Sequence, residues 1–160
     1  MNEKKPLLNY HQALDKSEKY CVYQERCQSE MRNKLYEWGM HSQEVESIIA
    51  DLITNQFINE ERFAKAYTNG KFKIKQWGKI KIKNELRKRK ISEYCISNAL
   101  KEISDKDYID VLKNIINKKA KLIKNANTFV YKNKLAEYAV SKGYENNLVW
   151  EQIEIFIKLK

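Results

Sequence analysis

The apolar residues of this chain recur in an order that repeats about every 50 positions. The first copy consists of Met31, Leu35, Met40, Val45, Ile48, Ile49 and Leu52. A shift of 51 positions places on them Ile82, Leu86, Ile91, Ile96, Ala99, Leu100 and Ile103. A further shift of 53 positions gives Leu135, Ala139, Tyr144, Val149, Gln152, Ile153 and Phe156, of which Gln152 alone is a polar mismatch. We therefore interpret the chain as three copies of one unit.

Within each copy the apolar positions follow the spacing of one face of an α-helix. Each copy thus predicts a helix, a short break and a second helix. Gly39 and Gly143 stand at the breaks, where a residue in the left-handed conformation commonly ends a helix. Ser42 and Ser92 stand just after a break, where an N-cap is expected.

A further amphipathic helix is predicted ahead of each pair, over Ala13 to about Gln24, Glu60 to about Lys73, and Asp107 to about Leu122. The predicted fold class is all-α, with about three tandem three-helix repeats stacked into an elongated array, straight or curved. The expected divisions are a flexible N-terminal tail over 1–10 and repeats over 11–57, 58–104 and 105–160. A helical bundle whose apolar pattern recurs by chance is the alternative. One Pro and four Gly are few for a sheet, which favours helices.

Positive charge is concentrated in the middle of the chain. The net charge of the chain is +10. Residues 61–90 hold 12 basic and 2 acidic side chains, so the net charge of this segment alone equals that of the whole chain. On a helix from about Gly78 to Lys90, a basic stripe follows one face, made of Lys79, Lys83, Arg87 and Lys90. Neighbouring like charges repel on a helix, whereas a polyanionic partner would attract them. The candidate residues facing such a partner are Lys73, Lys75, Lys79, Lys83, Arg87 and Lys90; a merely solvated surface is the alternative.

Three aromatic residues, Tyr67, Phe72 and Trp77, lie among these basic residues. Aromatic rings in a basic surface can stack on nucleic-acid bases. Tyr67 and Phe72 also share a helical spacing with Phe63, however, and this favours packing in the core for both.

Residues of the common catalytic and metal sites are sparse. His11 and His41 are the only histidines, and they lack the spacing of metal ligands. The four glycines are scattered and form no phosphate-binding loop. The acidic pairs Glu60–Glu61 and Asp105–Asp107 fit the first turns of helices, where the helix dipole favours anions. We expect no catalytic, cofactor or metal site, and a protein that is not an enzyme.

The sequence also favours a location in the cytoplasm. No apolar run approaches the roughly 18 residues of a membrane span, and the first residues lack the apolar core of a secretion signal. Cys21, Cys27 and Cys95 are odd in number and lack metal-type spacing. They are expected to be free, mostly buried thiols in a reducing compartment.

The run FINEERFA, from Phe57 to Ala64, resembles a motif of the RecX family of RecA regulators. There, a hydrophobic residue, two acidic positions and one variable position precede an Arg-Phe pair at the start of a helix. The family's next positions are Gly, a hydrophobic residue and Glu-Leu, here Gly78, Ile80 or Ile82, and Glu85-Leu86. Upstream, Glu30 to Leu35 is similar to the family's Glu-Leu-x-x-Lys-Leu. The resemblance covers residues 11–157 and is strongest over 27–103, and the length, three-repeat layout and basic balance agree with it.

A few positions depart from the family pattern. Asn59 and Glu60 stand at the two acidic positions of the motif, where the family has two Asp. Lys90 replaces the usual Gly before Ile91, which leaves the position of that helix break open. Cys27 stands where the family often has Ser.

The resemblance implies a fold of tandem three-helix units and a regulatory role. It implies binding to the RecA–single-stranded-DNA filament, and restraint of the recombinase, ATPase and coprotease activities of RecA in DNA repair and the SOS response. The implied partners are RecA and single-stranded DNA, direct or within the filament, with a monomer sufficient and no membrane or small-molecule substrate. Arg62 is expected to form a salt bridge within its repeat, and Phe63 to lie in the core. A basic helical protein that binds DNA directly, without RecA, is the alternative.

Overall fold

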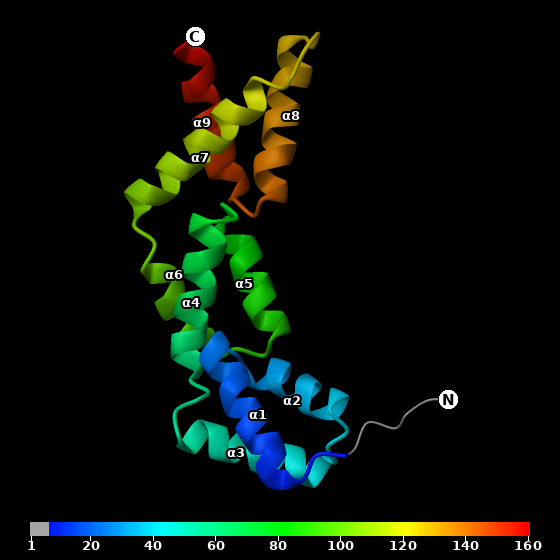
Figure 1. Ribbon diagram of the computed structural model, residues 1–160. Helices are drawn as coiled ribbons and strands as arrows, with labels where there is room; N and C mark the ends of the chain where they lie inside the picture. The colour runs from blue at the N-terminus through cyan, green and yellow to red at the C-terminus, as the bar shows by residue number, and fades with distance from the viewer. Residues whose placement is uncertain (1–6) are drawn as a thin grey trace, which may run out of the picture.

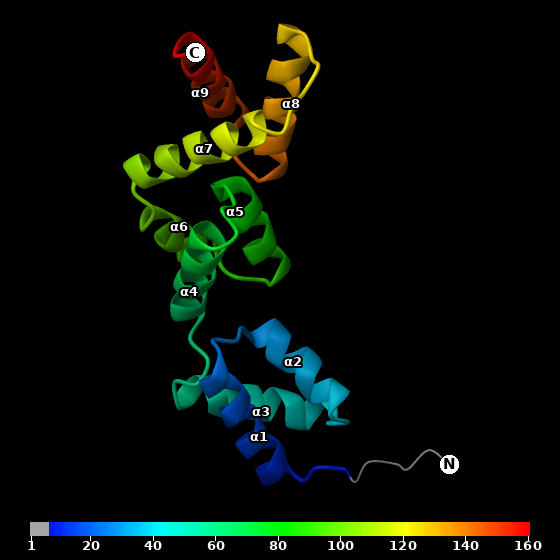
Figure 2. The same cartoon turned by 45° about the horizontal axis from the view of Figure 1, so that its top comes forward.

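The computed structural model describes residues 7–160, and every regular element among them is an α-helix. The helices are α1 Tyr10–Tyr23, α2 Gln28–Glu37, α3 Ser42–Thr54, α4 Glu60–Lys73, α5 Lys79–Lys88, α6 Glu93–Lys101, α7 Asp105–Ala120, α8 Thr128–Ser141 and α9 Asn146–Lys158. They form three groups of three that follow one another along an elongated molecule (Figure 1). We call α1–α3 unit 1, α4–α6 unit 2 and α7–α9 unit 3. The same order of groups is seen in the turned view (Figure 2).

The helix boundaries largely follow the predicted caps and breaks. Ser92 caps α6 by accepting a hydrogen bond from the backbone N–H of Cys95, as predicted. The prediction for Ser42 is wrong by one position, because Ser42 is the first residue of α3 and His41 occupies the N-cap. Asn9 caps α1, so part of the predicted tail belongs to unit 1, while residues 1–6 of that tail lie outside the described residues.

The break between the second and third helix of each unit contains a left-handed residue. Gly39 and Gly143 have φ of 87° and 100°, as expected at their positions. Lys90, the equivalent residue of unit 2, also adopts a positive φ, of 59°. Helix α5 therefore ends at Lys88, two residues before the predicted end, and the break is kept without a glycine. For a residue with a Cβ this conformation costs roughly 1–2 kcal/mol.

The buried apolar residues form two cores rather than three. Unit 1 has a core of its own, which includes Met31, Leu35, Val45, Ile48 and Leu52. Units 2 and 3 share a second, continuous core that runs from Phe63 to Ile153. The three cysteines are free and buried, as predicted, and burial raises the pKa of the Cys21 thiol to about 11.

The second junction, between units 2 and 3, brings two backbone segments into direct contact. The N–H of Gly78 donates a hydrogen bond to Lys142 O over 2.8 Å, and the N–H of Ile80 donates to Gly143 O over 3.0 Å. A side-chain Cβ added at Gly78 would lie 2.5 Å from Tyr144 N and closer still to the backbone of Gly143. Only glycine leaves room for this approach.

Aromatic side chains seal the second junction beside these glycines. The rings of Tyr108 and Tyr144 stack with their centroids 5.0 Å apart, and Phe72 packs against Tyr108. The Tyr108 hydroxyl donates to Glu145 over 2.6 Å and accepts from the N–H of Lys79 over 3.0 Å. Burial, together with the bond to Glu145, raises the pKa of Tyr108. Its hydroxyl therefore keeps its proton and stays a donor at neutral pH.

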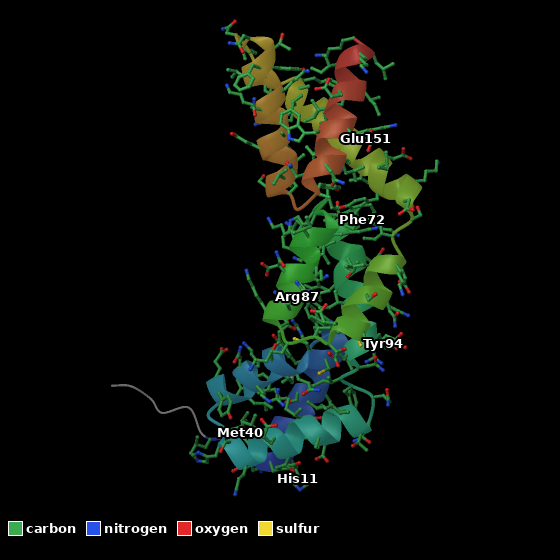
Figure 3. All side chains as sticks on the ribbon, turned by 180° about the vertical axis from the view of Figure 1, so that it is seen from behind. His11, Met40, Phe72, Arg87, Tyr94 and Glu151 are labelled. Atoms are coloured by element: carbon green, nitrogen blue, oxygen red, sulfur yellow. The ribbon has the colours of Figure 1, made fainter. Side chains whose placement is uncertain are left out.

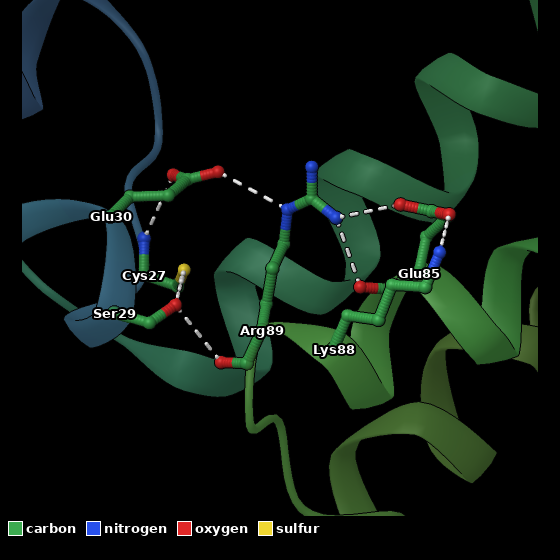
Figure 4. A network of polar contacts seen from close by, with 6 residues as sticks. All are labelled: Cys27, Ser29, Glu30, Glu85, Lys88 and Arg89. Atoms are coloured by element: carbon green, nitrogen blue, oxygen red, sulfur yellow. Dashed lines mark hydrogen bonds and ion pairs between the residues drawn. The ribbon is translucent and has the colours of Figure 1, made fainter. Parts of the chain in front are cut away.

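The first junction, between units 1 and 2, is largely polar (Figure 4). Arg89 Nε of unit 2 donates to Glu30 Oε1 of unit 1 over 3.3 Å, and Ser29 Oγ donates to Arg89 O over 3.2 Å. Arg62 pairs with Glu25 of unit 1. The expectation that Arg62 bridges within its own repeat is therefore wrong, because the α1–α2 connection brings an acid to it from the preceding unit. Cys27 is the apolar exception, since it lies in the shared core of units 2 and 3.

Leu86 is expected to be essential to the shared core, because its side chain is 0% exposed. Leu86→Ala should lower the free energy of unfolding by about 2–5 kcal/mol, as for other buried leucines. Ile80→Ala is the matched control on the same helix, because Ile80 is 45% exposed; its effect should stay within about 0.5 kcal/mol. Urea unfolding followed by circular dichroism measures both. A Leu86→Ala midpoint equal to that of the unchanged chain would place Leu86 outside the core.

Candidate interaction surface

The basic segment lies at the centre of the array, on α4, α5 and the connection between them. Residues 62–84 contain no Asp or Glu. Six lysines here form no ion pair with any carboxylate of the described residues: Lys71, Lys73, Lys75, Lys79, Lys81 and Lys83. The middle of the molecule therefore carries positive charge that neighbouring carboxylates leave unpaired.

Three of the predicted residues, Lys79, Lys83 and Arg87, share the side of α5 that faces α6. Lys79 and Lys83 line a groove of about 210 Å³ with Glu93 and Lys101. Arg87, labelled in Figure 3, donates from Nε to Glu93 Oε1 over 2.6 Å. The Arg87 guanidinium thereby lowers the pKa of Glu93. Three members of the predicted stripe thus lie on one side of α5, and the charge of the third is partly compensated by this acid.

The other three predicted residues lie elsewhere. Lys73 is the last residue of α4 and is exposed. Lys75, in the connection that follows, lines a second groove of about 390 Å³ between unit 1 and α4. Lys90 lies beyond the end of α5 in the left-handed turn, so it does not continue the stripe along the helix. The structure brings together three of the six predicted residues rather than all of them.

The aromatic residues of the segment divide between core and surface. Phe72 is buried in the shared core, as expected, and Phe63 is buried there too. Tyr67 and Trp77 are only partly buried. Lys71 Nζ lies 4.9 Å and Lys81 Nζ 4.6 Å from the centroid of the Trp77 ring. The sequence did not predict that Lys71 and Lys81 meet at one ring. A signal was present for Lys81, which stands four residues after Trp77, a spacing that brings side chains together near the start of a helix.

The described residues offer no other prominent chemical site. Among them, no three His, Cys, Asp or Glu side chains gather in a way that could hold a metal ion. The described helices also include none with the length and apolar content to cross a membrane. A groove of about 350 Å³ between α7 and α9 is lined mainly by apolar surface, including Ile116, Ile155 and Phe156.

The family comparison matches two of the units directly. Residues 13–52, which cover most of unit 1, match the profile of the first three-helix domain of RecX. Residues 59–100, which cover most of unit 2, match the profile of the second three-helix domain of RecX. The two matches together span about half of the chain and place the central basic helix α5 within the second domain.

Individual relatives agree with this assignment. The chain is 25% identical over 130 residues to the regulatory protein RecX of Bacillus cereus strain B4264, covering 81% of this chain and 48% of that protein. The RecX of Bacillus thuringiensis strain Al Hakam has the same identity and coverage. This chain therefore spans about half the length of the curated relatives it matches.

Solved structures share the fold. The crystal structure of RecX from Lactobacillus salivarius matches with a TM-score of 0.80 and 22% identity, over 94% of this chain and 97% of that one. A second crystal structure, of a regulatory protein RecX, matches with a TM-score of 0.79 and 23% identity, over 91% of this chain and 73% of that one. The predicted all-α array of tandem three-helix units is confirmed, and with two matched domains the chain belongs to the RecX family.

Proposed function

We propose that this protein binds the RecA–single-stranded-DNA filament in the cytoplasm and restrains the recombinase, ATPase and coprotease activities of RecA during DNA repair and the SOS response. The observation that carries the proposal is the match of units 1 and 2 to the two RecX domains. The curated relatives are regulatory proteins by name. A monomer without cofactor, metal or catalytic residue suffices for this role.

The shape and charge of the chain support this proposal. An elongated array of three units offers contacts spread along its length, and linked contacts multiply modest affinities. The central charge is suited to a filament that contains DNA, since lysines that meet phosphates release counterions. In this proposal the filament faces the predicted residues, Lys73, Lys75, Lys79, Lys83, Arg87 and Lys90.

The direct test is RecA-dependent ATP hydrolysis on single-stranded DNA, with the protein titrated below one copy per RecA. We expect inhibition well below that ratio, because one array would restrain several subunits. The affinity of the protein for bare single-stranded DNA is measured in the same buffer. Inhibition only at concentrations that saturate the DNA would contradict the proposal.

Direct DNA binding without RecA is the second candidate function. The six lysines without an ion pair in the described residues favour it. It predicts tight binding to bare DNA with a steep dependence on salt, because each phosphate contact releases counterions. The filament regulator is expected to bind bare DNA weakly and the filament strongly. Comparing both affinities at one salt concentration separates the two functions.

A further inference from the structure

Trp77 holds two lysine ammonium groups that come from different helices. Lys71 belongs to α4, Lys81 belongs to α5, and Trp77 lies in the connection between them. Their Nζ atoms lie 4.9 and 4.6 Å from the centroid of the ring. At this range the ring attracts each cation by roughly 0.5–1 kcal/mol at an exposed site. The indole therefore attracts two cations that come from neighbouring helices.

No carboxylate of the described residues neutralises either cation. The acids that line the groove beside Lys71 are Glu25 and Glu30, and the acid that lines a groove with Lys81 is Glu85. All three form ion pairs with other cations: Glu25 with Arg62, Glu30 with Arg89, and Glu85 with Lys88 and Arg89. Neither ammonium group forms an ion pair among the described residues, so an anion beside the ring would be attracted to both. The two lysines around Trp77 thus favour the binding of a negatively charged ligand.

Further contacts between cations and aromatic rings line the groove of about 390 Å³ between unit 1 and α4. Lys71 Nζ also lies 5.3 Å from the centroid of Tyr67, and the Arg89 guanidinium lies 4.8 Å from the same ring. Lys75 and the 79% exposed side chain of Ile74 line the same groove. We call Tyr67, Lys71, Trp77, Lys81 and Arg89 the Trp77 strip.

The backbone N–H groups at the start of α5 are not available to bind an anion beside Trp77. The N–H groups of Gly78, Lys79 and Ile80 open the helix, and each donates to an atom of unit 3. No free backbone donor of these three is left for an anion. Recognition would therefore come from the side chains of the strip.

We propose that the Trp77 strip binds the backbone of single-stranded DNA, with Lys71 and Lys81 on phosphates and the bases against Trp77 and Ile74. Single strands present phosphates and flat apolar bases in alternation, and proteins bind them with basic grooves that contain aromatic side chains. On α5, Lys81 is two positions from both Lys79 and Lys83, about 200° around the helix. The strip and the basic stripe are thus two different basic faces.

This inference deepens the proposed function and rests on it for its biological setting, since it identifies which face meets the DNA strand. The test uses the full chain without RecA, so its outcome is independent of the ATPase titration. Fluorescence anisotropy of a labelled oligothymidylate measures affinity over a range of salt concentrations. The test variant is Lys71→Gln with Lys81→Gln.

The matched control is Lys16→Gln with Lys34→Gln in unit 1. Lys16 Nζ lies 4.3 Å from the Trp38 ring and Lys34 Nζ 5.8 Å from the Tyr20 ring, so the control removes the same charge from cation–ring contacts. Lys34 differs from the tested lysines in that it also pairs with Glu37. For the Lys71 and Lys81 variant we expect affinity lower by about tenfold and a log–log salt slope smaller by about 1.4, or 0.7 per lost phosphate contact. The control should change neither quantity by more than about twofold.

A second variant, Trp77→Leu, keeps both lysines but removes the ring that positions them. We expect weaker binding by several fold, with circular dichroism unchanged. Unchanged affinity and slope in the Lys71 and Lys81 variant, or an equal loss in the unit 1 control, would overturn the proposal. Displacement of the oligonucleotide by poly-L-glutamate at equal charge concentration would overturn it in favour of an acidic protein partner.

Discussion

Replacing Gly78 with alanine is expected to destabilise the chain by about 3 kcal/mol or more, at the upper end of the range for overpacked sites. The added Cβ would lie 2.5 Å from Tyr144 N and closer to the backbone of Gly143. Backbone atoms cannot rotate away as a side-chain tip can, so the second junction would have to open. Gly78 has an ordinary φ of −74°, so the effect is one of space alone. Urea unfolding monitored by circular dichroism measures it.

Gly70→Ala is the matched control for this change. Gly70 lies inside α4, and a Cβ built there meets no atom within 4 Å. Alanine should therefore stabilise the chain by about 0.5–1 kcal/mol, the usual gain over glycine inside a helix. The two variants add the same methyl group to the same unit with opposite expected signs. A Gly78→Ala protein as stable as the Gly70→Ala protein would refute the close approach of the two segments.

Reversing the charge of Lys79, Lys83 and Arg87 to glutamate is expected to weaken inhibition of RecA by at least about tenfold. Loss of several phosphate contacts alone changes affinity by this order. The fold should persist, because the inward-facing Ile82 and Leu86 of α5 are unchanged. The measurement is the ATPase titration, with circular dichroism to confirm the helical content. Unchanged inhibition would remove the basic stripe from the mechanism.

A control variant tests whether the effect depends on the position of the reversed charges or only on the net charge of the chain. Lys118, Lys121 and Lys124 are exposed in unit 3, and their change to glutamate alters the net charge by the same amount. We expect this variant to keep most of its inhibition, because these residues lie in the last turn of α7 and the connection after it, and that end of α7 lies away from α5 (Figure 1). An equal loss in both variants would mean that overall charge, and not the stripe, attracts the filament.

The sequence predicted the helices well because each helix depends on the spacing of apolar residues and on capping residues that are close in the chain. The spacing of apolar residues predicted the helices, and α4 has the predicted bounds of Glu60 and Lys73. The sequence left the position of the break at Lys90 open, because lysine rarely adopts a positive φ and no glycine marks the turn there. Ser42 was misassigned as a cap because the neighbouring His41 caps without a side-chain hydrogen bond.

The junctions and the surface were harder to predict because they depend on residues far apart in the chain. Gly78 and Gly143 are 65 positions apart, and no periodic pattern links them. Arg62 likewise pairs with Glu25 of the preceding unit. A helical wheel placed Lys79, Lys83 and Arg87 on one face, but it could not show that Glu93 of the next helix would pair with Arg87.

The two junctions differ in their expected sensitivity to salt. The second junction is held by a continuous apolar core and backbone hydrogen bonds. The first junction is held mostly by ion pairs and a few hydrogen bonds, with Cys27 as an apolar contact, and dissolved salt screens ion pairs. Raising the ionic strength is therefore expected to loosen the attachment of unit 1 while units 2 and 3 stay joined.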